Sequence, residues 1–123
     1  MEEINYLKKF EKSSVKASLE RIELLLEYID NPQKELKVIH IAGTNGKGST
    51  AAILTSIYKN SGYNVATYTS PGVTELNERI RINDQNISDE DLAKLVRKIK
   101  PYINRVAEKL EYPTFFEIMT AIA

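Results

Sequence analysis

The chain has 123 residues, enough for one compact domain, and its 17 basic and 17 acidic residues give a net charge of zero. This balance excludes a whole-chain field that would attract nucleic acid or an anionic membrane surface. The absence of cysteine excludes disulfides, thiolate nucleophiles and Cys-ligated zinc, so a metal would need oxygen ligands or the single His40.

Residues 1–35 are expected to form leading helices. Apolar residues recur there at spacings of three and four, which predicts a helix with one buried stripe: Val15, Leu19, Ile22, Leu26 and Ile29. Ser13 or Ser14 can cap its start, and Asn31-Pro32 ends it. The acidic start does not resemble a signal peptide, and no apolar run approaches the roughly 20 residues of a membrane span, so we expect a cytoplasmic protein.

Residues 36–69 have the order and length of a strand, helix, strand unit. Leu36 to Ala42 is β-branched and apolar, which predicts a buried strand, and Tyr63 to Thr69 predicts a second, parallel one. Ser49 to Asn60 is expected to be a helix with Ile53, Leu54 and Ile57 on its inner face and Gly62 just past its end. The expected fold class is α/β, with a P-loop-type parallel sheet flanked by helices.

Residues 70–87 are expected to form an irregular loop, Ser70 to Glu78, and then a short hairpin. Arg79 to Asn83 alternates like a strand, and Asp84-Gln85 could turn it back through Asn86-Ile87. The whole chain, residues 1–123, is then one partial domain.

Residues 88–123 are expected to be helical. Ser88-Asp89-Glu90-Asp91 resembles a capping box, and the apolar stripe that follows it is Leu92, Leu95, Val96, Ile99, Ile103, Val106 and Leu110. Pro101 must kink this helix or open a second segment. The last helix, from Thr114 to Ala123, stops without Gly, Pro or another stop signal, which is typical of a segment cut from a longer protein.

The chemistry is expected in the segment Gly43 to Thr50, where a strand is predicted to meet a helix. Its glycines let the backbone turn amide hydrogens inward, the following helix adds its positive end, and Lys47 adds a full charge. A triphosphate is the natural ligand. The strict P-loop spelling is not met, because Ile41 stands four positions before Asn45 and Gly48 stands where a hydroxyl usually follows the lysine. The alternative is a glycine-rich turn that merely joins strand to helix.

The run Gly43-Thr44-Asn45-Gly46-Lys47-Gly48-Ser49 resembles the nucleotide-loop signature of folylpolyglutamate synthases, a branch of the ATP-dependent ligases that includes the Mur ligases. Three further stretches agree with this family: Leu19-Glu20-Arg21-Ile22, Thr69-Ser70-Pro71 followed by Asn77-Glu78-Arg79-Ile80, and Pro113-Thr114-Phe115-Phe116-Glu117. The resemblance covers essentially the whole chain and implies its amino-terminal ATP-binding piece.

This resemblance implies a Mur-ligase-like domain that uses ATP and Mg²⁺ to activate a carboxylate of folate, or of dihydropteroate, as an acyl phosphate that the amine of L-glutamate attacks. It implies nucleotide binding by Thr44, Asn45, Gly46, Lys47, Gly48, Ser49 and Thr50, with Lys47 catalytic. It also implies a magnesium ligand at Ser70 and a folate or pteroate pocket at Thr114 and Phe116. The other metal ligands and the carboxyl-terminal domain of the family lie beyond Ala123.

Each assignment has a structural alternative. Ser70 could satisfy a turn, and Thr114-x-x-Glu117 has the spelling of a capping box, so Glu117 is interpreted as structural. His40 and Phe115 are interpreted as packed residues, and Arg79 and Arg81 as a solvated strand face. Many relatives have His where this chain has Gly72.

Two other functions stay open: a P-loop nucleotide kinase or NTPase, and a non-catalytic nucleotide-binding module. A kinase would have a hydroxyl directly after Lys47, and Gly48 disfavours it. We expect no nucleic-acid or membrane partner, a monomeric parent enzyme, an inactive fragment, and self-association of the fragment through its last helix.

Overall fold

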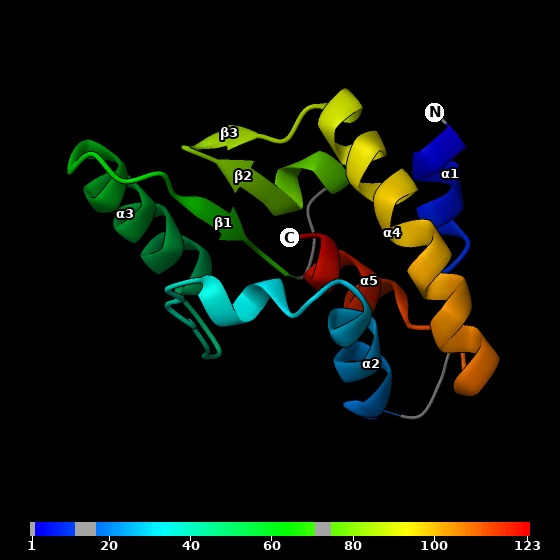
Figure 1. The fold of residues 1–123 in the computed structure, drawn as a ribbon. Helices are drawn as coiled ribbons and strands as arrows, with labels where there is room; N and C mark the ends of the chain where they lie inside the picture. Colours follow the sequence, from blue (N-terminus) through cyan, green and yellow to red (C-terminus); the bar gives the residue numbers. More distant parts are fainter. Residues whose placement is uncertain (1, 12–16, 71–74) are drawn as a thin grey trace. The chain divides into compact units, whose positions relative to one another are not determined.

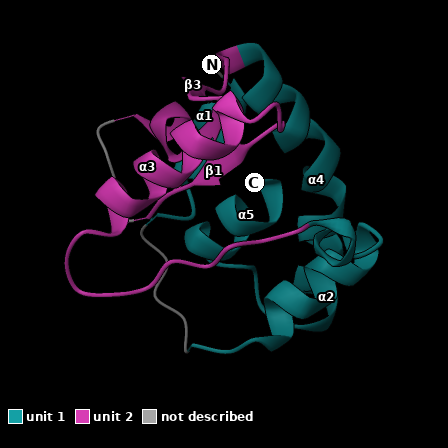
Figure 2. Ribbon diagram, turned by 90° about the vertical axis from the view of Figure 1, so that its left-hand side faces the viewer, with its two compact units in different colours: residues 1–36, 90–123 teal, residues 37–89 magenta. Residues whose placement is uncertain are grey.

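The computed structural model describes residues 2–11, 17–70 and 75–123 (Figure 1). They divide into two compact units, one of residues 1–36 and 90–123 and one of residues 37–89 (Figure 2). The helices are α1 (Glu2–Lys8), α2 (Glu20–Tyr28), α3 (Lys47–Asn60), α4 (Asp89–Lys109) and α5 (Phe115–Ile122), and the strands are β1 (Ala66–Tyr68), β2 (Ile80–Ile82) and β3 (Gln85–Asn86). Within the described ranges, no helix has both the length and the apolar character that crossing a membrane requires.

In the first unit, α4 has the amphipathic character that its sequence predicts. The apolar residues of one face are buried: Leu92, Val96, Ile99, Ile103 and Val106. The helix runs through Pro101 without a break, so the expected second segment is wrong. Pro101 is exposed, and the helical bond that it cannot donate to the carbonyl of Arg97 can be replaced by water.

The buried face of α2 differs from the predicted stripe. The helix begins at Glu20, so Leu19 precedes it and is 71% exposed, while Ser13, Ser14 and Val15 lie outside the described residues. The buried pair is Arg21 and Leu25, four residues apart, with Ile22 and Leu26 half-buried beside them. The buried line is thus one position away from the predicted stripe, on the face that packs on α5.

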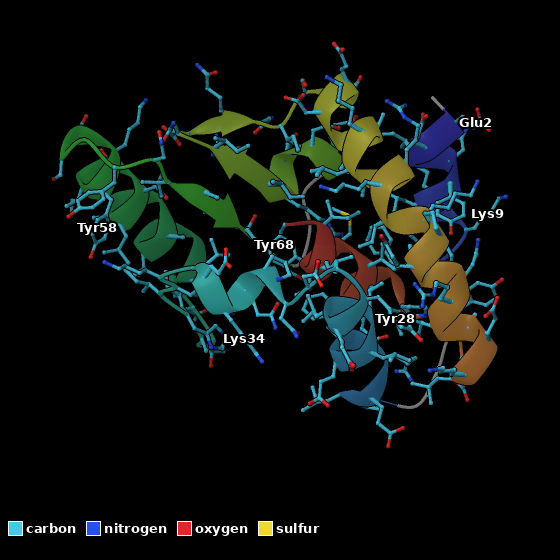
Figure 3. All side chains as sticks on the ribbon, viewed as in Figure 1. Glu2, Lys9, Tyr28, Lys34, Tyr58 and Tyr68 are labelled. Carbon is cyan, nitrogen blue, oxygen red and sulfur yellow. The ribbon has the colours of Figure 1, made fainter. Side chains whose placement is uncertain are left out.

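The remaining contacts of the first unit hold α1 and the end of α2 to α4. The guanidinium of Arg97 donates to Glu3 at 2.7 Å, and Leu7 is fully buried. Tyr28, labelled in Figure 3, stacks on Tyr102 with ring centroids 6.5 Å apart. The leading helices are therefore part of this unit's own core rather than appendages to it.

The second unit holds a three-stranded antiparallel sheet in the order β1-β2-β3, visible in Figure 1. Ala66 pairs with Ile82 and Tyr68 with Ile80. The predicted hairpin is confirmed, with its turn one residue earlier than expected. Asn83 and Asp84 have φ of 49° and 67°, which is the left-handed backbone that a tight hairpin turn needs and that asparagine and aspartate tolerate.

The predicted strand from Leu36 to Ala42 is not formed, and the expected parallel crossover is wrong. No other described segment pairs with these residues, and the strand predicted from Tyr63 shortens to β1, which pairs antiparallel with β2. A strand is stabilised by the backbone hydrogen bonds of a neighbour, so an apolar run alone does not make one. Val38 and Ile39 are 69% and 57% exposed.

The inner face of α3 is also not the predicted one. Ile53 and Ile57 are exposed, Leu54 is half-buried, and the buried residue is Thr55. The Thr55 hydroxyl donates to the carbonyl of Ala51 at 2.7 Å and lies 2.7 Å from the hydroxyl of Thr67 on β1. Since the Thr55 hydroxyl has one hydrogen, Thr67 is the donor of the second bond. The helix ends as predicted, with Gly62 in the left-handed region after Ser61.

Candidate functional site

The loop before α3 turns sharply at a glycine. Gly46 is the N-cap of α3 with φ of 79°, a left-handed conformation that glycine adopts without the steric cost of a Cβ atom. The amide of Thr50 donates to the carbonyl of Gly46 at 2.9 Å, which makes the first bond of the helix. The turn therefore lies at a glycine as expected, and the helix begins at Lys47, two residues before the predicted start at Ser49.

The first turn of α3 presents polar groups to solvent. The amides of Lys47, Gly48 and Ser49 precede any carbonyl within the helix that could accept them, and Gly46 has no side chain to cap them. These groups lie at the positive end of the helix dipole. Thr44, Asn45, Gly48, Ser49 and Thr50 are all exposed. This arrangement suits an anion that carries several acceptor oxygens.

Lys47 adds its charge directly over this loop. Its ammonium donates to the carbonyl of Gly43 and, at 3.5 Å, to that of Thr44. The side chain is half-buried, so it folds back along the loop rather than extending into solvent. The full positive charge and the helix end therefore act on the same small region, as a triphosphate requires.

Ser70 lies two residues after the end of β1 and is exposed. It belongs to the same unit as the loop, and the Thr55–Thr67 contact joins α3 to its strand. Among the described residues, no hydrogen bond joins Ser70 to Lys47. Pro71 and Gly72 lie outside the described residues.

Oxygen donors for a metal are present as hydroxyls rather than as a carboxylate cluster. Among the described residues, no group of three or more His, Cys, Asp or Glu side chains could hold an ion. His40 is exposed, so its interpretation as a packed residue is wrong. Gly48 offers no hydroxyl, while Ser49, Thr50 and Ser70 offer exposed ones. Mg²⁺ commonly binds one or two protein oxygens and completes its coordination shell with phosphate and water oxygens. These exposed hydroxyls fit such a coordination.

The predicted folate residues belong to the first unit, at the start of α5. Thr114 is the N-cap, and the capping box with Glu117 is confirmed: the Glu117 amide donates to the Thr114 hydroxyl at 3.1 Å and the Thr114 amide donates to Glu117 Oε1 at 2.7 Å. Phe116 is 54% exposed, and Phe115 is half-buried rather than a core residue.

Arg21 is the polar residue whose structural role the sequence reasoning missed. Its Nε donates to Glu117 Oε1 at 2.9 Å, and both side chains are almost fully buried. The predicted stripe gave no signal for it, because Arg21 lies one position before Ile22 and outside that stripe; once buried, its guanidinium needs a buried acceptor. Arg81, by contrast, reaches Asp84 of its own hairpin at 3.8 Å, in agreement with a partly solvated strand face.

Comparison with known proteins gives consistent similarities. The chain is 45% identical over 114 residues to the dihydrofolate synthase/folylpolyglutamate synthase of Bacillus subtilis, covering 91% of this chain and 26% of that protein. The crystal structure of folylpolyglutamate synthase from Thermotoga maritima superposes with a TM-score of 0.89 at 42% identity, covering 99% of this chain and 28% of the other. The folylpolyglutamate synthase of Mycobacterium tuberculosis, solved with ADP and AMPPCP, gives a TM-score of 0.87 at 29% identity, with 98% and 26% covered. No family model matches the chain.

Proposed function

We propose that this chain supplies the nucleotide-binding part of an ATP-dependent ligase that adds glutamate to folate. The chain is homologous to about a quarter of the length of the folylpolyglutamate synthases. Its α/β fold is that of the Mur-ligase-like ATP-binding domain of these enzymes. The observation that carries the proposal is the Gly46 turn, which leaves the first-turn amides of α3 without acceptors in the same loop whose carbonyls bind the Lys47 ammonium.

The proposed reaction explains why such a loop is needed. A carboxylate of folate takes the γ-phosphoryl group of ATP, and the amine of L-glutamate then displaces phosphate to form an amide. Both first reactants are anions, so they approach only where fixed positive charge offsets their repulsion. Lys47 supplies that charge, and the amides of Gly48 and Ser49 hold phosphate oxygens in place.

Mg²⁺ would be held by Ser70 and phosphate oxygens, and when bound it would neutralise charge on the triphosphate. Thr44, Asn45 and Thr50 contribute exposed hydroxyl and amide groups around the loop. These polar groups orient the triphosphate, while the charge of Lys47 acts on the transferred group.

Thr114 and Phe116 are proposed to contact the pterin or pteroate ring. Phe116 is exposed on the first turn of α5, where a flat aromatic side chain can stack on a flat ligand ring. Dihydropteroate is proposed as a second substrate, because the relative from Bacillus subtilis carries both activities in its name. We also propose a cytoplasmic location and a monomeric parent enzyme, with self-association of the isolated chain through its exposed apolar residues.

One alternative function has a specific observation in its favour: a nucleotide-binding module without catalysis. The chain spans only 26% of its Bacillus subtilis relative. Calorimetry separates the two. MgATP and a reduced folate are titrated into the 123-residue chain and into an enzyme of the relatives' length that contains it. The ligase proposal expects nucleotide binding by both proteins and folate binding by the longer one. If neither protein binds MgATP, the proposal and the module are both wrong.

A further inference from the structure

Asn45 is followed by Gly46, and this is the only asparagine followed by glycine in the sequence. Both residues are exposed. In the parts of the chain that the structure describes, no hydrogen bond holds the Asn45 side chain or the Gly46 amide. The nucleophile and the electrophile of an intramolecular reaction are therefore neighbours in the chain, and neither is held by a hydrogen bond, in the loop proposed to bind phosphate.

We propose that Asn45 is a site of spontaneous deamidation that switches off the phosphate loop. The Gly46 amide nitrogen loses its proton to base and attacks Cγ of Asn45. The new bond joins Gly46 N to Cγ, the bond from Cγ to Nδ2 breaks, and ammonia leaves. Water then opens the five-membered imide at either carbonyl, which gives aspartate or isoaspartate at position 45. The net change is one amide and one water converted to a carboxylate and ammonium.

The loop's geometry favours this reaction at Asn45 over the other asparagines. Gly46 has no Cβ to obstruct the attack of its amide nitrogen, and the space on the side where a Cβ would lie is open. Asn77, in contrast, donates its side-chain amide to the carbonyl of Ile87 at 2.7 Å. Asn31 precedes Pro32, whose nitrogen has no hydrogen and cannot attack.

The product changes the electrostatics of the loop, and this consequence rests on the proposed function. A carboxylate at position 45 adds negative charge two residues before Lys47, whose ammonium already lies on the carbonyls of Gly43 and Thr44. It would compete with phosphate for that ammonium and repel the triphosphate. The isoaspartate form also lengthens the main chain directly before the helix start. A bound triphosphate, in turn, would restrain the loop and slow the reaction.

The test is an incubation of the 123-residue chain at mildly alkaline pH, followed by peptide mass spectrometry of each asparagine. Asn45 should convert at least about tenfold faster than Asn77, a barrier lower by about 1.4 kcal/mol, and Asn31 should not convert by this route. The Asn45→Gln variant should react far more slowly, because its ring would need one more atom. Conversion of Asn45 no faster than that of Asn77 would overturn the proposal.

A second experiment distinguishes a failure of the deamidation proposal from a failure of the nucleotide-binding proposal. MgATP at saturation should slow conversion of Asn45, and Asn45→Asp should bind MgATP at least about tenfold more weakly, the effect of roughly 1.4 kcal/mol of added repulsion. Fast conversion that MgATP does not slow would support the modification and contradict nucleotide binding at this loop. An unchanged affinity of Asn45→Asp for MgATP would contradict the proposal that deamidation weakens nucleotide binding.

Discussion

The guanidinium of Arg21 donates to the same carboxylate oxygen of Glu117 that accepts the amide of Thr114, with N···O distances of 2.9 Å and 2.7 Å. One oxygen therefore ties α2 to α5 and caps α5 at the same time. This pair is buried, and a buried charge that loses its partner is costly because water cannot replace the lost contact.

Arg21→Met is expected to lower the free energy of unfolding by about 3 kcal/mol, since it leaves the Glu117 carboxylate buried without a cation. Denaturant unfolding measures the change. The matched control is Lys94→Met, which removes an exposed pair with Glu90 at 3.7 Å and should cost less than about 0.5 kcal/mol. Equal effects of the two substitutions would show that the buried pair has no special role.

Glu3 is expected to make the first unit sensitive to acid. The hydrogen bond from Arg97 holds the pKa of the Glu3 carboxyl below its usual value of 4.5. A depressed pKa means that the folded state favours the charged form, so its stabilisation is present above about 4.5 and is lost as pH falls through the folded-state pKa. Glu3→Gln should therefore flatten the dependence of unfolding on pH in that acidic window. Glu90→Gln serves as the control, and an unchanged pH dependence in Glu3→Gln would refute the assignment.

Ser70→Ala is expected to raise the Mg²⁺ concentration needed for half-maximal rate in an enzyme of the relatives' length, because one coordinating oxygen is lost. Nucleotide binding without metal should stay unchanged, and this is measured by calorimetry. Ser61→Ala, at the end of α3, is the control. A magnesium requirement identical to that of the unmodified enzyme would remove Ser70 from the site.

The isolated 123-residue chain is expected not to join glutamate to a folate, even with saturating MgATP. Stabilising the transition state of acyl transfer needs groups on both sides of the reacting atoms, and this chain spans 26% of its Bacillus subtilis relative. The assay incubates the chain with MgATP, tetrahydrofolate and labelled glutamate and measures labelled folate. Turnover above that of a Lys47→Ala control would contradict the expectation.

Local features were predictable from the sequence where short-range physics decides them. The apolar stripe of α4, the capping box of Thr114 and Glu117, and the glycine after α3 depend on neighbours within a few residues. The structure confirms them, except that Leu110 lies past the end of α4 and is exposed. The glycine turn before α3 also depends on local backbone preference and was predictable, although the helix begins at Lys47, two residues before the predicted Ser49.

Features that depend on distant partners were not predictable in this way. An apolar run from Leu36 to Ala42 predicts a strand, but a strand needs a paired neighbour, and none of the described residues pairs with it. The buried face of α3 follows the contact between Thr55 and Thr67 rather than the apolar pattern. Arg21 became buried because Glu117, 96 residues later, accepts its hydrogen bond.

Calorimetric titration of the 123-residue chain with MgATP measures whether the Gly43 to Thr50 segment binds a triphosphate through Lys47. Lys47→Ala should weaken binding by about 1.5 to 3 kcal/mol, the usual contribution of a hydrogen bond to a charged group, and should leave the melting temperature nearly unchanged. Lys59→Ala, in the last turn of the same helix, should bind as the unmodified chain does. Unchanged affinity with a lowered melting temperature in Lys47→Ala would mean that Lys47 is structural and does not bind the triphosphate.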